Sequence, residues 1–221
     1  MPLAGRPMVE WSIAACRAAG SIRSIVVACP PGHVHELAGQ DLGVVDGGET
    51  RAQSVSNALE AVGTELVAIH DAARPLVTPE LIEEVVAILA ADPEAAGAIA
   101  ATPVTDTIKQ AGKRSPEASR QTSSDRLTAS DANGIVNPSV EVETTLDRER
   151  LWAAQTPQVF RVEALRKALA VDSEGIAAAT DEAMLVEAAG GKMLIHPSSV
   201  ENLKVTTPLD QRLAELLLGD R

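Results

Sequence analysis

The chain has 221 residues, of which 45% are hydrophobic and 23% are charged, a composition typical of one medium-sized globular domain with a substantial core. Its 31 acidic and 19 basic residues give a formal net charge of −12, and such a surface, without a basic stripe, is not expected to bind a nucleic-acid polymer. No segment is apolar for long enough to cross a membrane, and the two cysteines lie in apolar surroundings without metal-ligand spacing. We therefore expect a cytoplasmic domain with free thiols and no membrane contact.

The hydrophobic pattern of residues 1–101 alternates between the periods of helices and strands. In chain order it predicts a helix over 9–19, a strand over 22–28, a short helix over 33–38, a short strand over 43–45, a helix over 51–62, a strand over 65–69, a helix over 79–91 and a strand over 96–101. Repeated strand–helix units of this kind predict an α/β fold, with a mostly parallel, Rossmann-like sheet covered by helices on both faces.

Residues 105–147 break this alternation. Segments 105–110 and 142–146 look extended, whereas 111–141 is rich in Ser, Thr, Asp, Asn and Arg and cannot bury enough apolar surface to order itself. We therefore expect a β-arm over 105–147 that protrudes from a single domain spanning 1–221, with a mobile polar insert at 111–141. Beyond the arm the pattern predicts, in order, helices over 162–170 and 181–189, strands over 192–196 and 202–205, and a helix over 207–218.

The segment 70–75, His-Asp-Ala-Ala-Arg-Pro, lies between a predicted buried strand and a predicted helix. Asp71 and Arg74 thus follow the carboxyl end of a strand, where open α/β sheets hold their ligands. A carboxylate that can bind a metal, beside an anion-binding guanidinium, indicates phosphate chemistry. The alternative is a turn in which Asp71 caps the following helix and Arg74 pairs locally, and spacing alone leaves both readings open.

Four further segments could contribute to a site. Residues 46–51, Asp-Gly-Gly-Glu-Thr-Arg, place paired glycines before a helix start whose amides favour anions, although an ordinary strand–turn–helix connection looks the same. Lys204 precedes a predicted helix and is either a functional cation or an exposed edge lysine. Residues 151–160 contain two of the three aromatic residues and a rigid Thr-Pro turn, and residues 180–182, Thr-Asp-Glu, resemble a helix cap.

These motifs, taken together and in order, resemble the 2-C-methyl-D-erythritol 4-phosphate cytidylyltransferase family. The resemblance spans the whole chain except the polar insert. The ordered set that carries it is Asp-Gly-Gly-Glu-Thr-Arg at 46–51, His-Asp-Ala-Ala-Arg-Pro at 70–75, Thr-Asp-Thr-Ile-Lys at 105–109, Gln-Thr-Pro-Gln at 155–158, Thr-Asp-Glu-Ala at 180–183 and Asn-Leu-Lys-Val-Thr at 202–206.

The resemblance implies an enzyme that transfers CMP from CTP to methylerythritol phosphate and releases pyrophosphate. It implies Mg²⁺ bound at Asp71, with Asp71 and Lys204 in the catalytic centre. The residues it assigns to CTP are Gly48, Glu49, Ser54, Asp71 and Lys204. The residues it assigns to methylerythritol phosphate are Arg74, Thr107, Arg148, Thr156 and Thr180. It also implies a homodimer, because the arm at 105–147 reaches into the site of a partner chain in this family.

The sequence departs from the family pattern at three points. The stretch 111–141 is longer than the family's arm leads us to expect, and Glu49 stands where the family carries aspartate. The family's first strand and its glycine-rich loop, which supplies an arginine and a lysine for the triphosphate, have no counterpart in these 221 residues. We therefore expect this sequence to be part of a longer natural chain and, as it stands, to show little or no turnover, because each lost electrostatic group of this kind costs about 10²–10³ in rate.

Two alternatives to this function stay open from the sequence. One is a related cytidylyltransferase that acts on another polyol phosphate, such as ribitol 5-phosphate. The other is a non-catalytic module for nucleotide binding or dimerisation.

Overall fold

The computed structural model describes residues 2–34, 37, 41–112, 140–170 and 179–219. The chain divides into two compact units. The first combines Met1–Thr102 with Ala154–Arg221, and the second is Pro103–Ala153. No helix among the described residues is both long and apolar enough to span a membrane.

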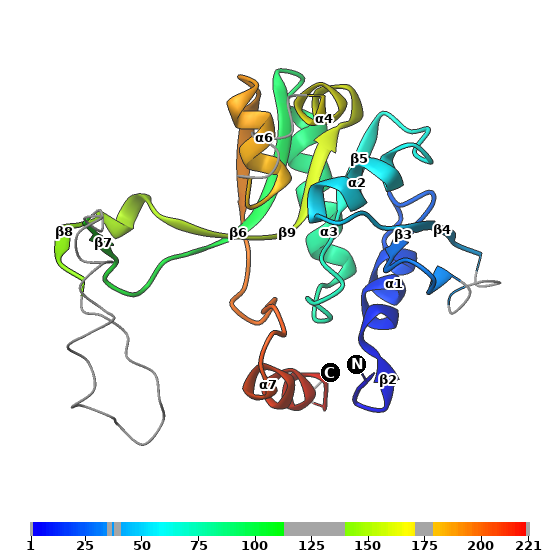
Figure 1. Cartoon of the computed structure of the whole chain (residues 1–221), viewed down its shortest axis with the longest axis horizontal. Coiled ribbons are helices and arrows are strands. Elements are labelled where there is room, and N and C mark those ends of the chain that lie inside the picture. The colour runs from blue at the N-terminus through cyan, green and yellow to red at the C-terminus, as the bar shows by residue number, and fades with distance from the viewer. Residues whose placement is uncertain (1, 35–36, 38–40, 113–139, 171–178, 220–221) are drawn as a thin grey trace, which may run out of the picture. The chain divides into compact units, whose positions relative to one another are not determined.

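A four-stranded sheet forms the centre of the first unit, in the order β10 (Lys192–Pro197), β6 (Ala95–Pro103), β9 (Trp152–Arg161) and β5 (Leu66–Ile69) (Figure 1). Strands β10 and β6 are parallel, whereas β5 and β9 are antiparallel. The β6 strand is built mostly from alanine and glycine and is almost wholly buried. Its small side chains let helices approach the sheet closely.

Helices cover both faces of this sheet. The helix α3 (Pro79–Ala91) packs on one face, where its core residues meet Ala98, Ala100 and Val159. The helices α4 (Val162–Leu169) and α6 (Glu182–Ala188) pack on the other face, around Ile99, Ala101 and Phe160. Alternate residues of β6 and β9 therefore face opposite cores, as the two-residue period of a strand requires. This confirms the predicted α/β class with helices on both faces of the sheet.

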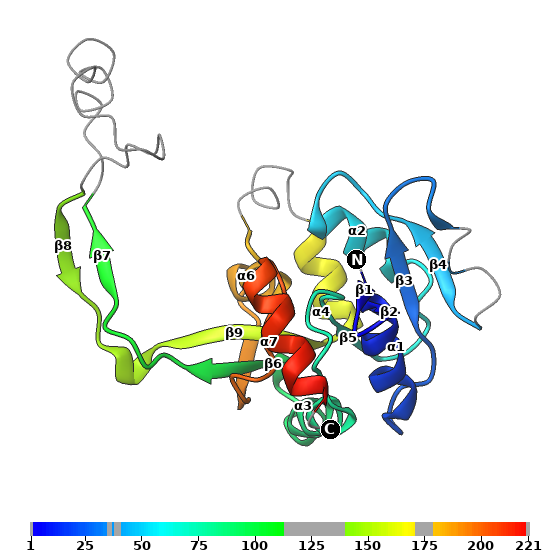
Figure 2. The ribbon, with the colours of Figure 1, turned by 90° about the horizontal axis from the view of Figure 1, so that it is seen from below.

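The remaining elements of the first unit surround this layered core. Strands β3 (Val26–Cys29) and β4 (Gly43–Asp46) form a separate parallel pair that contacts α2 (Arg51–Leu59). A short hairpin of β1 (Pro2–Leu3) and β2 (Arg6–Pro7) leads into α1 (Met8–Ala18). The C-terminal α7 (Pro208–Gly219) packs on that hairpin around the buried Leu3 and Ala214 (Figure 2).

The structure corrects the prediction for residues 151–160. The expected rigid turn is the ten-residue strand β9, and Thr156 and Pro157 lie inside it. Because β9 is covered on both sides of the sheet, its apolar and amide side chains do not alternate, and the Thr-Pro pair, taken from the sequence as a turn, lies inside a strand. Every residue from 155 to 160 is buried.

Smaller corrections concern three other predicted elements. Residues 202–205 form no strand and run as an irregular segment between β10 and α7. The predicted strand 22–28 shortens to Val26–Cys29, and the predicted helix 51–62 ends at Leu59. Of the predicted helix 33–38, residues 35, 36 and 38 lie outside the described residues.

The second unit contains an antiparallel pair, β7 (Lys109–Ala111) with β8 (Val142–Thr145), and a 3₁₀ turn at Arg148–Arg150. All residues of both strands are exposed. Of the insert predicted at 111–141, residues 113–139 lie outside the described part of the chain.

Candidate active site

The loop that follows β5 has a fixed backbone. The Arg74 amide donates to the Asp71 carbonyl at 2.8 Å, and the Val205 amide donates to the Ala73 carbonyl at 2.7 Å. The helix α3 is capped by Thr78, whose hydroxyl accepts from the Leu81 amide at 3.2 Å. Asp71 is therefore not the cap of this helix, which removes one alternative that the sequence left open.

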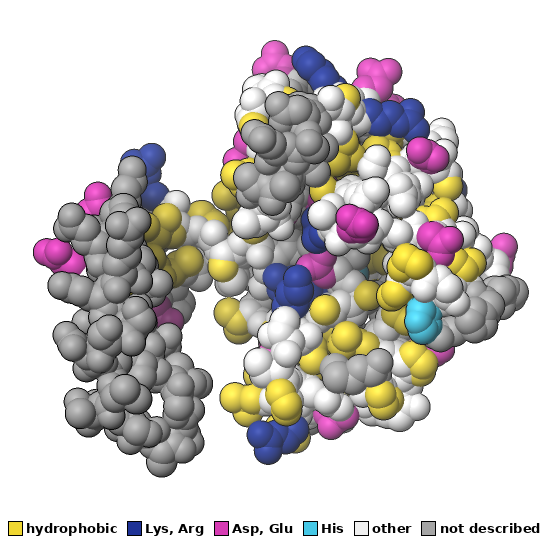
Figure 3. Space-filling view, in the orientation of Figure 1, with side chains coloured by type: hydrophobic (Ala, Val, Ile, Leu, Met, Phe, Trp, Pro, Cys, Tyr) yellow, Lys and Arg dark blue, Asp and Glu magenta, His cyan; other side chains and the backbone are white. Residues whose placement is uncertain are grey.

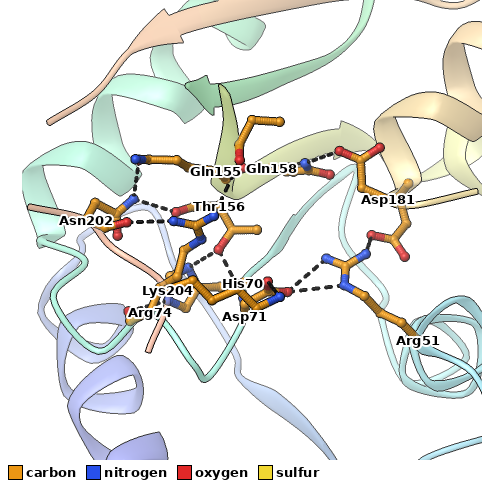
Figure 4. Close-up of polar contacts among 12 residues, drawn as sticks. Arg51, His70, Asp71, Arg74, Gln155, Thr156, Gln158, Asp181, Asn202 and Lys204 are labelled. Carbon is orange, nitrogen blue, oxygen red and sulfur yellow. Dashed lines mark hydrogen bonds and ion pairs between the residues drawn. The ribbon is translucent and has the colours of Figure 1, made fainter. Parts of the chain in front are cut away.

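Asp71 holds its carboxylate between two cations (Figure 4). The Lys204 ammonium donates to Oδ2 at 2.9 Å, and Arg51 donates to Oδ1 through Nε at 3.2 Å and Nη2 at 3.1 Å. The Asp71 side chain is 16% exposed, whereas that of Lys204 is 46% exposed. Burial opposes ionisation of Asp71, but Lys204 and Arg51 together hold its pKa below the usual value. The site therefore presents an ionised carboxylate next to an accessible ammonium group.

Arg51 also reaches a second carboxylate. Its Nη1 donates to Oε2 of Glu182, the first residue of α6, in a close ion pair. The Glu182 side chain is 1% exposed, and burial raises its pKa although Arg51 opposes that shift. Sequence reasoning assigned neither residue to the site. A signal was present, because an arginine in the first turn of a helix opposes the helix dipole and needs a carboxylate partner.

His70 connects the Asp71 loop to β9. Its Nε2 lies 3.0 Å from the Arg74 carbonyl oxygen, and its Nδ1 lies 3.0 Å from Oγ1 of Thr156. A carbonyl only accepts, so Nε2 carries the proton, Nδ1 accepts, and the Thr156 hydroxyl donates. The Asp71 amide in turn donates to the same hydroxyl oxygen at 3.1 Å. Burial lowers the pKa of His70 to about 4, which keeps the ring in the neutral form that this arrangement requires.

Arg74 points from the same loop toward the segment that carries Lys204 (Figure 4). Its Nη1 donates to the Asn202 carbonyl at 2.7 Å. The side-chain Nδ2 of Asn202 donates to Oε1 of Gln155 and to the Thr156 carbonyl, each at 2.9 Å. Burial lowers the pKa of Arg74, and its Nε has no hydrogen-bond partner within the described structure. The segment around Lys204 is thus tied to both the Asp71 loop and β9.

The glycine-rich segment folds over the start of α2. Thr50 caps this helix, since its hydroxyl accepts from the Gln53 amide at 3.1 Å. The Ser54 hydroxyl donates to the Thr50 carbonyl at 2.9 Å and accepts from the Gly48 amide at 3.0 Å. A Cβ atom on Gly48 would lie 2.3 Å from Cγ of Gln53, so any larger residue at this position would force Gln53 to move. Glu49 is exposed, and its amide donates to Gln53 at 2.9 Å.

The sequence-predicted residues fall into three groups in the structure. Asp71, Arg74, Thr156 and Lys204 belong to one hydrogen-bonded network. Gly48, Glu49 and Ser54 surround the start of α2, which carries Arg51 into that network. Thr180 is exposed just before Asp181, and Asp181 rather than Thr180 caps α6, because the Asp181 Oδ1 accepts from the Met184 amide at 3.0 Å.

Thr107 and Arg148 belong to the second unit. Both are exposed, and the Arg148 Nη1 donates to the Thr105 carbonyl at 2.7 Å. The network around Asp71 itself contains residues of the first unit alone.

The chemistry of this network suits a phosphorylated ligand. Lysine and arginine side chains beside an ionised carboxylate can bind phosphate oxygens and, through the carboxylate, a divalent cation. On the face shown in Figure 3, the described part of the first unit carries its acidic and basic side chains scattered rather than in a basic stripe. The cations that face Asp71, Lys204 and Arg51, supply the local positive charge that a small anionic ligand requires.

Comparison with known proteins gives one consistent family. The family that matches is IspD, 2-C-methyl-D-erythritol 4-phosphate cytidylyltransferase, over residues 1–124 and 113–220. The chain is 38% identical to the 2-C-methyl-D-erythritol 4-phosphate cytidylyltransferase of Bordetella petrii, covering 96% of this chain and 86% of that protein. It is also 38% identical to the enzyme of the same name from Gloeobacter violaceus, covering 99% and 86%.

A solved structure agrees with this result. The crystal structure of the Thermus thermophilus enzyme of the same name matches with a TM-score of 0.74 at 31% identity, and covers 99% of this chain and 92% of its own.

Proposed function

The chain belongs to the 2-C-methyl-D-erythritol 4-phosphate cytidylyltransferase family, and from this premise we propose that it transfers CMP from CTP to 2-C-methyl-D-erythritol 4-phosphate and releases pyrophosphate. The observation that carries the proposal is the Asp71 carboxylate held between Lys204 and Arg51, with Arg74 on the same loop. This arrangement lies in the motifs by which the sequence resembles the family.

The reaction asks the protein for positioning and charge neutralisation. A phosphate oxygen of the acceptor attacks the α-phosphorus of CTP in line with the leaving pyrophosphate, and no covalent nucleophile from the protein is needed. Lys204 is accessible enough to move its ammonium from Asp71 to the reacting phosphate. Arg74 supplies a planar guanidinium for the acceptor phosphate.

Asp71 is the residue that would hold Mg²⁺. No group of three His, Cys, Asp or Glu side chains converges within the described part of the chain, so the protein offers one carboxylate rather than a cage. Mg²⁺ is commonly bound in this way, by one or two carboxylates together with substrate phosphates and water. Bound there, Mg²⁺ neutralises charge on the triphosphate.

The remaining contacts are assigned by position. Gly48, Glu49 and Ser54 lie at the start of α2 and would contact the cytosine and ribose of CTP. Thr180 lies exposed at the start of α6 and would contact methylerythritol phosphate. Thr156 would contact the same acceptor through the remaining lone pair of its hydroxyl oxygen, since the other accepts from the Asp71 amide.

We infer that the active form is a homodimer in which the arm at 105–147 brings Thr107 and Arg148 to the partner's site. The support is the exposure of every residue in β7 and β8, with Val142 at 55%. A two-stranded hairpin without a covered face is marginally stable in water. A second chain would supply that cover.

The test is product formation from radiolabelled CTP, with Mg²⁺ and either methylerythritol phosphate or ribitol 5-phosphate, over incubations long enough to detect slow turnover. We expect CDP-methylerythritol and pyrophosphate, with less product from ribitol 5-phosphate. A preference for ribitol 5-phosphate would assign the chain to another acceptor. Calorimetric binding of CTP without pyrophosphate from any acceptor would instead support a non-catalytic nucleotide-binding module.

A further inference from the structure

Arg51 occupies an unusual position for a cation. It is the first residue of α2, where the positive end of the helix dipole disfavours positive charge. Its guanidinium is nevertheless fully engaged, with Nε and Nη2 on Oδ1 of Asp71 and Nη1 on Oε2 of Glu182. All three guanidinium nitrogens are therefore bonded to carboxylates of the protein. This arrangement suits Arg51 to orient neighbouring side chains rather than to bind a ligand.

We propose that Arg51, braced by Glu182, is the positioning residue for the Asp71 carboxylate. Its two hydrogen bonds converge on Oδ1 and hold that oxygen on the side of α2, which leaves Oδ2 on the side of Lys204 (Figure 4). Oδ2 is therefore the single oxygen offered to the cation that accompanies the triphosphate. The inference rests on the proposed function, since it concerns the metal-binding role of Asp71.

Glu182 explains how Arg51 can do this without weakening the site. A lone guanidinium on Oδ1 would reduce the attraction of Asp71 for a second cation. The buried carboxylate of Glu182 offsets that charge, so the Arg51–Glu182 pair is neutral as a whole and leaves the charge of Asp71 for the ligand. Groups placed behind a metal ligand in this manner fix its orientation and basicity.

The same pair connects two parts of the site. Arg51 begins the helix that follows the glycine-rich segment, and Glu182 begins the helix that follows Thr180. Asp71 is thus oriented by the two helix starts assigned to the nucleotide and the acceptor.

The variant that tests this role is Arg51→Lys, which keeps the charge but cannot make both converging bonds to Oδ1 together with the third to Glu182. Arg166→Lys is the matched control. The Arg166 Nη2 donates to the Leu59 and Val62 carbonyls, at the opposite end of the same helix α2. It therefore reproduces an arginine-to-lysine change that loosens α2 without touching Asp71.

The measurement is calorimetric binding of CTP with and without Mg²⁺. We expect Mg²⁺ to strengthen CTP binding to the wild type and to Arg166→Lys, and this gain to fall by about 10–100-fold in Arg51→Lys. CTP binding without Mg²⁺ should stay the same in all three proteins. Glu182→Gln should lose part of this Mg²⁺-dependent gain. In the Arg51→Lys background, Glu182→Gln should cause little further loss, because Glu182 acts through Arg51.

The outcomes separate this inference from the proposed reaction. An Mg²⁺ gain in Arg51→Lys equal to that in Arg166→Lys would overturn the positioning role, whatever the acceptor. A selective loss of the gain in Arg51→Lys, in a protein that forms no CDP-methylerythritol, would support the positioning role and reject the proposed acceptor. Thermal melting of each variant shows whether a loss of the Mg²⁺-dependent gain in CTP binding comes from unfolding. The positioning role also requires that this gain be present only when residue 51 is arginine.

Discussion

The two units of the chain hold their candidate site residues in opposite ways. Around Asp71 in the first unit, the loop amide, both carboxylate oxygens and both ring nitrogens of the preceding histidine have partners inside the protein. In the second unit, β7 and β8 are exposed throughout, and their side-chain contacts are surface pairs such as Lys109 with Thr145 at 2.6 Å. A buried hydrogen-bond network fixes the geometry of its side chains but tolerates few substitutions, whereas surface pairs add little to the stability of the fold.

This contrast predicts different responses to substitution. A change near Asp71 should alter the site and the stability of the first unit together. A change in the second unit should alter catalysis or association, because that unit has few buried contacts of its own to lose.

The largest effect is expected at Asp71 itself. Asp71→Asn removes the charge that Lys204 and Arg51 share, and leaves two cations facing a neutral amide. We expect the turnover of methylerythritol phosphate to fall by about 10²–10³ or more. Asp92→Asn is the matched control, because Asp92 also pairs with a lysine, Lys192, at 2.7 Å on the surface.

The measurement is the initial rate of pyrophosphate release at saturating CTP. Equal rates in Asp71→Asn and Asp92→Asn would contradict the role of the Asp71 carboxylate.

The second prediction concerns the exposed unit. Arg148→Ala removes a guanidinium whose hydrogen bond goes to the Thr105 carbonyl of the same unit. We expect turnover to fall by about 10²-fold, as for loss of a substrate-positioning group, with no change in the melting temperature of the first unit. Arg150→Ala, in the same 3₁₀ turn, is the control and should keep its activity.

Rates, melting curves and light scattering would be compared for both variants. A dimer that persists in Arg148→Ala while activity is lost fits a residue that reaches the partner's site. Turnover of methylerythritol phosphate by a monomeric wild type would refute the contribution in trans.

Much of the fold can be predicted from the sequence, because the hydrophobic period is clear wherever a helix or strand has one covered face. The helix α3 begins and ends at the predicted residues, 79 and 91, and its threonine cap and first-turn proline account for that agreement. The strand β9 was missed because both its faces are covered, so its pattern carries no two-residue alternation. Burial by distant segments is not encoded in the local pattern.

The candidate site shows the same limit. Asp71 and Arg74 could be selected from one short motif, and the structure joins them to Lys204. Arg51 and Glu182 lie 131 positions apart, and no local signal pairs them. Their partnership depends on how α2 and α6 pack, which is a tertiary property.

The third prediction is a pH dependence of folding that comes from His70. Its pKa is about 4 in the folded chain, against an ordinary value near 6.5 when unfolded. As pH falls below about 6.5, the unfolded chain takes up a proton that the folded chain refuses, so the free energy of unfolding decreases until pH reaches about 4. The full difference corresponds to about 3 kcal/mol.

Urea unfolding at about pH 7 and about pH 4.5 would measure this loss. His70→Asn retains an acceptor for Thr156 but does not titrate, so the part of the slope that belongs to His70 should disappear. The same pH dependence in wild type and His70→Asn would show that other groups, such as Asp71, cause it.

The smallest effect is expected at the start of α2, where the contrast is between two glycines of the first unit. A Cβ at Gly48 would lie 2.3 Å from Cγ and 2.5 Å from Cβ of Gln53, whereas a Cβ at Gly63 would meet no atom within 4 Å. The clash at Gly48 involves the inner part of the Gln53 side chain, so relief requires a shift of the helix start and of Arg51 with it.

Gly48→Ala should therefore destabilise the chain by about 1–3 kcal/mol and weaken CTP binding. Gly63→Ala should be neutral or slightly stabilising, because it restricts the unfolded chain. Paired denaturation curves and CTP titrations decide the matter, and equal stabilities of the two variants would mean that the glycine-rich segment is looser than the hydrogen bonds of Ser54 and Thr50 indicate.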